Sequence, residues 1–573
     1  MENGASYDER APLDEALKTQ INRWELFLNQ QSKKQRLVAR YIYEHWFLAH
    51  IYFDEVAANG DPIFFRLVRS KTPPGEPIDI ISTRRPYDDP GVKSFYYRLW
   101  QERGSVLLKT HLPLALNTSR MARITELFLA PKYNVFNFPS YKSKTASNPF
   151  KAFEQIPTQS KYQFMLDEAQ FTIMGFIKGP VCRGQTALSV INDRLWVFFV
   201  DPNYFSSEKV NQFLAKQTNN LRLPAESESN ALTVTNWFKY AGAQSDYLKA
   251  KQKLINKEYK GVKTDLQLIW QGDGYNKNAS LTIFRHFDSA TVEKGLIGET
   301  PKTAWLIDYA LLERIHYLLV AGFDVYGNVG HQFNTRAYMD YLRMEGENNF
   351  LSLLPKESRQ ALRKYWYRDA SAPTIKFLRD EAYQLNRETS ITYKTSAPFD
   401  ELLTMIKHYL SPVLSHRFDL DETRDHMELT KINKVPAKAA NLMPEISMLM
   451  VSNNDGSKRA YSLLRNSAHY NILSMFNEED RRAYDEDNLT IVPGFIGDYP
   501  GALWHTDEEN LRHFVNQLRM VNSEEDYQTL RTHFGIRRTD VNFWQFSDDL
   551  HRLAKQYKGI EYGLFDYNRL QDR

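Results

Sequence analysis

The single cysteine of this sequence is the first residue that could carry chemistry. Cys182 is followed by Arg183 and lies between Pro180 and Gly184. A neighbouring cation lowers the pKa of a thiol, so Cys182 is a candidate nucleophile or soft metal ligand, with Arg183 as its activating partner. The alternative is a small core residue. Because Pro180 stands where a nucleophile elbow needs glycine, we expect no elbow here.

Charged and imidazole side chains interrupt the apolar run at residues 304–323 and form a second candidate site. Glu313 and His316 are three residues apart, which places a carboxylate and an imidazole one helical turn apart, as in di-iron bundles. No second Glu-x-x-His step is present, so the alternative is an ordinary pair on a helix surface. We take Asp308, Glu313 and His316, with His331 further along, as candidate catalytic residues.

Three histidines nearer the N-terminus are candidates for cofactor binding. His45 and His50 lie in a helical pattern, but they are five residues apart, which does not place two ligands on one face of a helix. His111 ends a β-like run at residues 106–113, where a site residue is better placed. The alternative for each is a core or surface histidine without a ligand.

Two arginines beside a tyrosine could bind the phosphate of a lipid head group. Arg84, Arg85 and Tyr87 lie between two turn sequences, and guanidinium groups match phosphate oxygens. The same arginines could instead pair with Asp88 and Asp89. This segment is therefore either a phosphate site or a loop stabilised by its own ion pairs.

The elements that must position these residues are mainly helical. We expect one long helix with Thr300 as N-cap, Pro301 in its first turn and Gly322 at its end. β-like runs are expected at residues 195–200 and 264–270, and no internal repeat is evident.

The predicted fold class is α+β, with a largely helical main body, short β-sheets and a smaller mixed α+β C-terminal domain. We divide the chain into an N-terminal helical and β segment at residues 1–150, a mainly helical core at residues 151–390 that includes Cys182, and a C-terminal α+β domain at residues 391–573. A chain of 573 residues is long enough for two or more domains.

Composition narrows the functional classes. A net charge of +3, from 73 basic and 70 acidic residues, gives no field like that of nucleic-acid-binding proteins, so we expect no nucleic-acid partner. The charges inside residues 304–323 make a membrane span too costly there, so membrane association should be peripheral.

The first 18 residues have neither a basic nor an apolar signal region, so we expect no export signal in them. Aromatic residues, 13% of the chain, fit large cores or a cavity for an apolar ligand.

Three long strings resemble the bacterial fatty acid cis/trans isomerases. They are TPPGEPIDIISTRRPYDDPGVKSFYYRL at residues 72–99, PVCRGQTALSVINDRLWVFFVDP at residues 180–202 and EYGLFDYNR at residues 561–569. The resemblance covers nearly the whole chain. It implies conversion of cis double bonds to trans in the unsaturated acyl chains of membrane phospholipids, without ATP or NAD, as a periplasmic membrane adaptation to stress.

The resemblance also implies a c-type haem, whose oxidised iron draws electron density from the alkene so that the bond can rotate. The family attaches this haem through a Cys-x-x-Cys-His motif, which a chain with one cysteine cannot contain. The alternatives are a member that binds haem through a histidine, a catalytically incomplete or cofactor-free lipid-binding protein of the same fold, and, from a different class, a di-iron oxidoreductase.

Overall fold

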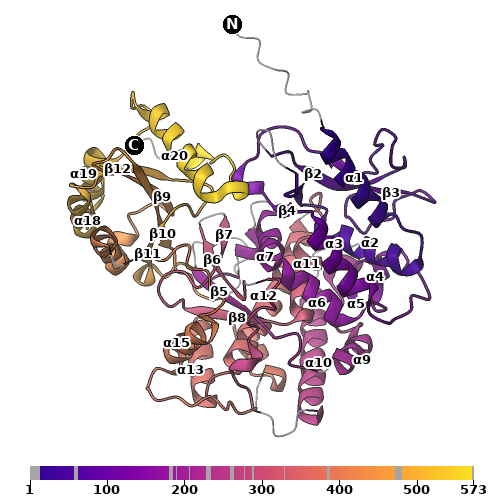
Figure 1. The fold of residues 1–573 in the computed structure, drawn as a ribbon. Helices are drawn as coiled ribbons and strands as arrows, with labels where there is room; N and C mark the ends of the chain where they lie inside the picture. Colours follow the sequence, from indigo (N-terminus) through magenta and orange to yellow (C-terminus); the bar gives the residue numbers. More distant parts are fainter. Residues whose placement is uncertain are drawn as a thin grey trace.

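Three four-stranded sheets and the helices around them make up the described part of the chain (Figure 1). The computed structural model describes residues 13–56, 62–179, 185–188, 190–205, 207–227, 234–258, 263–276, 278–286, 289–327, 329–383, 387–421, 423–471 and 481–570. In the view of Figure 1 the central sheet lies between the N-terminal and C-terminal sheets. The predicted α+β class is confirmed.

The N-terminal part consists of a sheet with helices packed beside it. Its elements are α1 (Glu15–Leu28), α2 (Lys33–Trp46), β1 (His50–Tyr52), β2 (Phe65–Ser70), β3 (Tyr96–Gln101), β4 (Pro113–Ala115), α3 (Thr118–Ile124), α4 (Ser143–Ala146) and α5 (Pro149–Ala152). Side chains of Asp14 and Ser32 cap α1 and α2 by accepting hydrogen bonds from first-turn backbone N–H groups. The strand order is β3-β2-β1-β4, and β4 is parallel to β1 while the other pairs are antiparallel.

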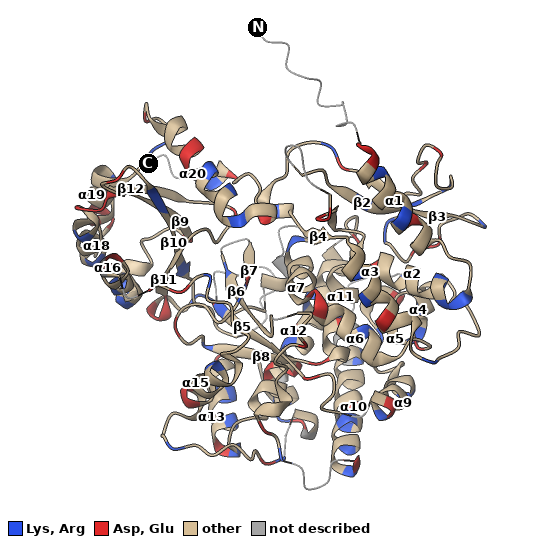
Figure 2. Cartoon of the chain, in the orientation of Figure 1, with Lys and Arg blue, Asp and Glu red and all other residues tan. Residues whose placement is uncertain are grey.

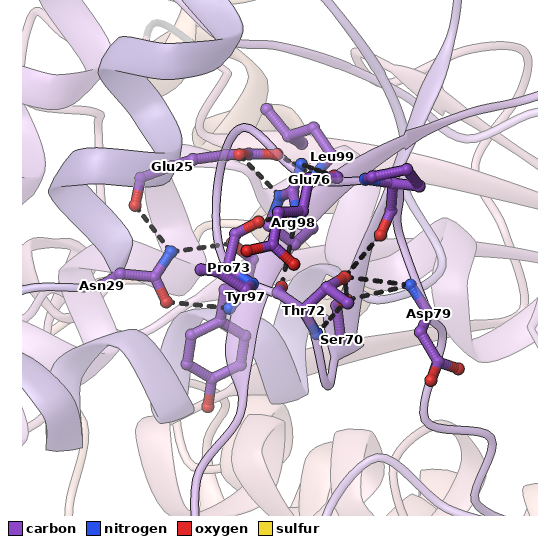
Figure 3. A network of polar contacts seen from close by, with 11 residues as sticks. Glu25, Asn29, Ser70, Thr72, Pro73, Glu76, Asp79, Tyr97, Arg98 and Leu99 are labelled. Atoms are coloured by element: carbon purple, nitrogen blue, oxygen red, sulfur yellow. Dashed lines mark hydrogen bonds and ion pairs between the residues drawn. The ribbon is translucent and has the colours of Figure 1, made fainter.

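Polar contacts tie the loop at residues 72–79 and β3 to α1 (Figure 3). The carboxylate of Glu25 accepts hydrogen bonds from Arg98 Nε at 2.7 Å and from Leu99 N at 2.8 Å. Arg98 also donates to three backbone carbonyl groups of the loop. Burial raises the pKa of Glu25, while the bonds from Leu99 and Arg98 oppose that rise. The string at residues 72–99 therefore contains a structural network that fixes this edge of the sheet.

The central part contains the most helices. Its elements are α6 (Thr158–Asp167), α7 (Ala169–Lys178), α8 (Gln185–Leu188), β5 (Arg194–Phe199), α9 (Ser207–Gln217), α10 (Val234–Glu258), β6 (Ser280–Arg285), β7 (Ala290–Lys294), β8 (Thr303–Ile307), α11 (Tyr309–Leu319), α12 (Val329–Leu351), α13 (Lys356–Trp366) and α14 (Ala372–Leu378). The strand order is β7-β6-β5-β8, and β8 is parallel to β5.

Two elements of the central part differ from the prediction. The expected helix from Thr300 is wrong in its first part, because residues 303–307 form β8, buried throughout and paired with β5 from Leu195 to Phe199. A short apolar run buried on both faces has no alternation to distinguish strand from helix. The β-like run at residues 264–270 is also wrong, because it forms a 3-10 turn at Leu266–Leu268 between two isolated bridges.

The C-terminal part is a sheet with helices on both faces. Its elements are α15 (Pro398–Leu410), α16 (Arg424–Leu429), α17 (Ala437–Ala440), β9 (Ile446–Ser452), β10 (Lys458–Asn466), β11 (Asn488–Pro493), β12 (Ala502–Asp507), α18 (Leu511–Met520), α19 (Glu524–Phe534) and α20 (Phe543–Lys558). The strand order is β11-β10-β9-β12, with β12 parallel to β9. Leu449 and Val451 pack with α18 and α19, whereas Met448 and Met450 pack with α20, as alternation along a strand requires.

All three sheets have the same topology, and the central and C-terminal sheets share sequence as well. In each sheet, three consecutive antiparallel strands are followed by a fourth that is parallel to the first. Residues 290–308 and 489–507 align without a gap. The identical pairs include Gly295/Gly494, Ile297/Ile496, Gly298/Gly497, Pro301/Pro500, Trp305/Trp504 and Asp308/Asp507.

Hydrogen bonds repeat at the turn that follows the third strand. Thr282 Oγ1 donates to the carbonyl oxygen of Gly295 at 2.8 Å and accepts from Ile297 N at 2.9 Å. In the C-terminal sheet, Ser462 Oγ makes the same two contacts, at 2.9 Å to the Gly494 carbonyl and 2.8 Å from the Ile496 N–H group. All four glycines of the two turns have positive φ. The chain therefore contains an internal repeat, and the expectation that it has none is wrong.

Apolar clusters join the parts of the chain. One cluster extends from Ile21 to Leu410, so the N-terminal and central parts share a core. Another joins Phe284 and Ile297 of the central part to α20 and the C-terminal sheet. None of the described helices is both long enough and apolar enough to span a bilayer.

Candidate functional site

Helix α11 begins at Asp308, in the middle of the helix that was predicted from Thr300. The carboxylate of Asp308 caps α11 by accepting a hydrogen bond from Leu311 N at 2.9 Å, and it also lies 2.5 Å from Lys251 Nζ of α10. Burial opposes ionisation of Asp308, but Lys251 outweighs it, so the pKa of this carboxyl lies below its ordinary value. Asp308 is therefore a cap and an ion-pair partner, not a mid-helix residue.

Glu313 lies one and a half turns further along α11 and is fully buried. Its Oε2 accepts a hydrogen bond from Tyr41 OH at 2.9 Å, and its Oε1 lies 3.2 Å from His45 Nε2. Tyr41 and His45 are both on α2, one turn apart. Two elements far apart in sequence thus bring a carboxyl group, a phenol and an imidazole together in the interior.

His45 and Glu313 face each other without a hydrogen bond. The Nδ1 of His45 lies 2.8 Å from the carbonyl oxygen of Tyr41, which can only accept, so Nδ1 carries a hydrogen. Its Nε2 lies 3.2 Å from Glu313 Oε1, and neither of these two buried atoms has a hydrogen-bond partner among the described residues. The pair therefore keeps two unsatisfied polar atoms in the interior.

His316, one turn beyond Glu313, stacks on His45. The two rings are 4.2 Å apart between centroids and inclined by 6°. His316 Nε2 donates to the carbonyl oxygen of Glu44 at 2.9 Å. Burial, with His45 nearby, lowers the pKa of His316 well below its ordinary value, so the ring is neutral. The Glu44 side chain accepts hydrogen bonds from Arg40 Nε and from Tyr317 OH.

A lysine and a second phenol complete this buried polar cluster. Lys161 Nζ donates to the carbonyl oxygen of Phe153 at 2.8 Å. Burial lowers the pKa of Lys161 to about 8, although Glu313 favours its charged form. Burial also raises the pKa of Tyr309 well above its ordinary value, and Glu313 adds to that rise. Lys161 can therefore exchange protons near neutral pH, whereas Tyr309 stays protonated.

Two narrow apolar pockets border the start of α11. The first lies between α6, α9, α10 and α11, and its lining includes Tyr162, Phe213 and Tyr309. The second lies against Leu268 and Leu306. The wall between them consists of the residues that line both: Val200, Phe205, Lys251, Ile255 and Asp308. Their free volumes are about 100 and 120 Å³.

The predicted head-group residues lie near the other end of α11. Arg84 and Arg85 contact Asp324, at 3.1 and 3.7 Å, and do not form ion pairs with Asp88 or Asp89. The alternative in which these arginines form ion pairs with Asp88 and Asp89 is therefore wrong, and Asp88 accepts a hydrogen bond from the backbone N–H group of Arg85. The phosphate site stays a prediction. Tyr87 is buried and stacks on Tyr317 with centroids 6.4 Å apart, so it does not face solvent beside the arginines.

His331 belongs to the same end of α11 and not to the cluster around Glu313. Its Nε2 accepts a hydrogen bond from Asp324 N at 3.0 Å, so the proton of the neutral ring is on Nδ1. Burial, followed by Arg85, lowers the pKa of His331 to about 4. Its ring is therefore a buried acceptor that orders the loop after α11.

His50 and His111 form a separate pair. Their Nδ1 atoms are 3.2 Å apart, and His111 Nε2 donates to the carbonyl oxygen of Ile560. Burial lowers the pKa of His50 to about 3 and that of His111 to about 4. The expected strand ending on His111 is wrong, because a 3-10 turn at Leu108–Thr110 precedes it and β4 follows it.

Comparison with known families gives the class of reaction that the protein catalyses. The family model described as fatty acid cis/trans isomerase (CTI) matches residues 1–572. The chain belongs to this family. Comparisons with curated proteins and with solved structures found no match. Membership in the CTI family makes the protein an isomerase of fatty acyl double bonds.

The c-type haem implied by the resemblance does not fit the described residues of this CTI protein. Covalent attachment uses two cysteines, and the chain has one. The pocket beside His45 and His316 has a free volume of about 10 Å³, room for about one water molecule. Both ring nitrogens of His50 and of His111 lie against other protein atoms. His50 contacts Arg66 and the Leu112 N–H group, and His111 contacts His50 and the carbonyl oxygen of Ile560. We therefore place no haem at His45, His316, His50 or His111.

A di-iron centre finds no ligand set in the described ranges either. Among those residues, no three side chains of His, Cys, Asp or Glu are placed to hold a metal ion. Glu313 contacts Tyr41 and His45, while His316 contacts the backbone of Glu44, so the two ends of the Glu-x-x-His step have different partners. The geometry gives the di-iron alternative no support.

The internal repeat shows which buried charges the fold does not need. In α18, which follows β12 as α11 follows β8, the buried residues are apolar: Leu511, Phe514, Val515 and Leu518. In α11 the buried residues include Glu313, Arg314 and His316, each no more than 3% exposed. Burying such groups costs free energy that an apolar helix avoids. This difference favours a functional role for Glu313 and His316 in the isomerase.

Sequence reasoning missed several members of the cluster. Tyr41, Glu44, Lys161, Tyr309 and Tyr317 were not predicted as site residues, although polar residues on the apolar face of α2 could have indicated Tyr41 and Glu44. Cys182 and Arg183 lie outside the described residues, so their proposed roles stay predictions.

Proposed function

We propose that this isomerase acts on the cis-unsaturated acyl chains of membrane phospholipids, without ATP or NAD, as a peripheral protein of the periplasm. The observation that carries the proposal is the pair of apolar pockets at the start of α11, with buried Glu313 close to Tyr309. An acyl chain that leaves the bilayer needs an apolar pocket, because exposure of each CH₂ group to water would cost about 0.8 kcal/mol.

The pockets must open to take an acyl chain. Free volumes of about 100 and 120 Å³ are below the roughly 300–1,000 Å³ of typical ligand pockets. Displacement of the wall side chains of Phe205, Lys251 and Ile255 would join the two pockets into one. Lys251 is held by Asp308 at 2.5 Å and by Glu345 at 3.3 Å, so this wall is polar at one point and apolar elsewhere.

Residues of this chain would hold the alkene and exclude water. Rotation about a double bond requires a weakened π bond, and hydrogen bonds or acid and base groups do little to an unactivated alkene. An electron acceptor bound to the protein would have to supply that weakening. The Glu313 carboxyl group and the ring faces of Tyr162 and Tyr309 could then stabilise positive charge on the alkene carbons in a site without water.

Gas chromatography of fatty acids tests the proposal. The protein is incubated with liposomes of cis-monounsaturated phospholipid, with no nucleotide or nicotinamide added, and trans isomers should accumulate. Lack of trans product, with binding of the liposome lipid retained, would favour the cofactor-free or incomplete lipid-binding alternative.

An absorption spectrum of the purified protein tests the cofactor separately. A Soret band would indicate bound haem and would contradict the poor fit at the described histidines. A weak near-ultraviolet band from an oxo bridge would instead support the di-iron alternative.

A further inference from the structure

The connection between β5 and β6 distinguishes the central sheet from its C-terminal repeat. In the repeat, β9 and β10 are joined by a tight turn at residues 453–457. Between β5 and β6, residues 200–279 intervene and contain α9 and α10. Since the repeat forms the same sheet without them, these helices are not needed to build the sheet. Insertions of this kind commonly carry function.

The inserted helices form much of both apolar pockets. From α9, Val210 and Phe213 line the first pocket. From α10, Lys251 and Ile255 line both pockets, Leu254 lines the first and Leu248 the second. One face of α10 therefore covers the proposed acyl-chain site.

The last part of α10 is basic. Residues 249–258 contain four lysines and a single acidic residue, Glu258. Lys253 and Lys257 are exposed, and the side chain of Lys257 is 81% exposed. Lys209 of α9 adds a further half-exposed ammonium group beside Glu258. Figure 2 shows Lys and Arg along the lower part of α10, whereas charges of both signs are interspersed elsewhere.

We propose that the exposed lysine face of α9 and α10 docks on the surface of an anionic phospholipid bilayer, directly above the apolar pockets. The inference rests on the proposed function and names the surface through which the lipid substrate arrives. Two features of the described residues support it together: the lysines complement phosphate charge, and the same helix lines the pockets with apolar side chains. Each lysine close to an anionic bilayer surface contributes about 1 kcal/mol of attraction.

Charge reversal on α10 tests the docking surface. The double variant Lys253→Glu, Lys257→Glu should bind vesicles containing phosphatidylglycerol about 30-fold more weakly than the unaltered protein, which corresponds to about fivefold for each lysine removed. Co-sedimentation at low ionic strength measures the binding. Binding of the unaltered protein to these vesicles should also weaken steeply as salt is added, because salt screens exposed charges.

A matched double variant on another helix is the control. Arg512→Glu, Arg519→Glu makes the same change in net charge on exposed residues of α18, and it should retain vesicle binding within about twofold. Equal loss of vesicle binding in both variants would show that the net charge of the protein determines binding. Unchanged binding in the α10 variant would show that another surface docks on the vesicle. Either result overturns the inference.

Activity on lipid dissolved in detergent micelles separates this inference from the proposed function. The α10 variant should convert cis to trans chains in micelles within about twofold of the unaltered protein, since docking is then not required. If the unaltered protein binds vesicles through α10 but yields no trans product in vesicles or micelles, the proposed function fails and the docking surface stands.

Discussion

Glu313 is the residue on which the proposed chemistry depends most. One of its oxygens accepts a hydrogen bond from Tyr41, while the other lies close to His45 Nε2 without the alignment of a hydrogen bond. A buried carboxyl oxygen without a full partner costs free energy. The cluster around Glu313 therefore keeps an unsatisfied acceptor in the interior, close to the apolar pocket that Tyr309 lines.

Replacement of Glu313 by glutamine should reduce activity more than stability. The amide oxygen of Glu313→Gln can still accept from Tyr41, but the amide carries no negative charge that could stabilise a positive alkene carbon. We expect turnover to fall at least about tenfold, equivalent to about 1.4 kcal/mol of activation free energy. Gas chromatography measures turnover, and circular dichroism should show a melting temperature within a few degrees of the unaltered protein.

A second buried carboxylate serves as the matched control. Glu345 pairs with the fully buried Arg314 and also contacts Lys251. Glu345→Gln removes the charge that Arg314 pairs with, while Lys251 keeps Asp308, and it should lower stability by about 3 kcal/mol or more. If Glu313→Gln behaved like Glu345→Gln, with a large fall in melting temperature, Glu313 would be a structural residue.

Burial of Lys161 should make stability depend on pH in the alkaline range. Its pKa falls from the ordinary value of 10.5 to about 8 in the folded protein, because burial disfavours the ammonium form. The unfolded chain then binds more protons between pH 8 and 10.5, so the cost of burying this group is full below pH 8 and is relieved as pH rises through that window.

Urea unfolding of Lys161→Met isolates this effect from other groups. Near pH 7 the variant should exceed the unaltered protein in stability by about 1–3 kcal/mol, and the difference should shrink toward pH 10. Lys144→Met, at an exposed lysine of α4, should show no such trend. A stability difference that stays constant with pH would contradict the depressed pKa.

At the scale of elements, the repeated glycine turns fix how the fourth strand of a sheet returns beside the first. Each turn follows the third strand and holds two glycines with positive φ, bridged by the hydroxyl group of Thr282 or Ser462. The backbone that leaves the turn then leads to β8 or β12. The helix after that strand starts at Tyr309 in the central sheet and at Leu511 in the C-terminal sheet, three positions later in the alignment.

Alanine substitutions in two left-handed glycines should separate backbone strain from steric contact. At Gly456, with φ of 82°, an added Cβ would meet nothing within 4 Å, so Gly456→Ala should cost about 1 kcal/mol. At Gly497, with φ of 101°, the Cβ would lie 2.7 Å from Ile446 Cδ1, and Gly497→Ala should cost about 3 kcal/mol or more. Equal losses in chemical denaturation would mean that the turn after β11 relaxes freely.

At the scale of the whole molecule, the C-terminal sheet is bound to the rest of the chain by apolar and polar contacts. Phe284 and Ile297 of the central part pack in the same cluster as Phe546 and Leu550 of α20. Polar contacts cross the same boundary, such as Arg194 Nη1 donating to Thr490 Oγ1 at 2.7 Å. The central and C-terminal parts should therefore unfold together.

Phe284→Ala tests this coupling. Removal of a ring that is 1% exposed should lower stability by about 3–5 kcal/mol, and tryptophan fluorescence and circular dichroism should still report one common transition. The control Phe136→Ala, at a ring that is 68% exposed, should change stability by no more than about 0.5 kcal/mol. Separate transitions in the unaltered protein would show that the C-terminal part folds independently.

The sequence by itself determined the fold class and the family. Amphipathic helices such as α15, α19 and α20 depend on local spacing, because residues three and four apart form their buried apolar faces. Long strings at residues 72–99, 180–202 and 561–569 carried the resemblance that the family match confirmed. The sequence also indicated a buried polar site in the region of Asp308 to His316, since charged residues are rare in apolar runs.

Only the tertiary structure decided which partners those residues have. Residues 303–307 form a strand because they pair with the edge of β5. The helix that follows therefore has Asp308, and not Thr300, as its N-cap. His45 contacts Glu313, and Arg84 contacts Asp324, although the two partners of each pair are far apart in the sequence. Such contacts depend on packing between elements, which local sequence patterns do not encode, whereas helix periodicity depends only on neighbouring residues.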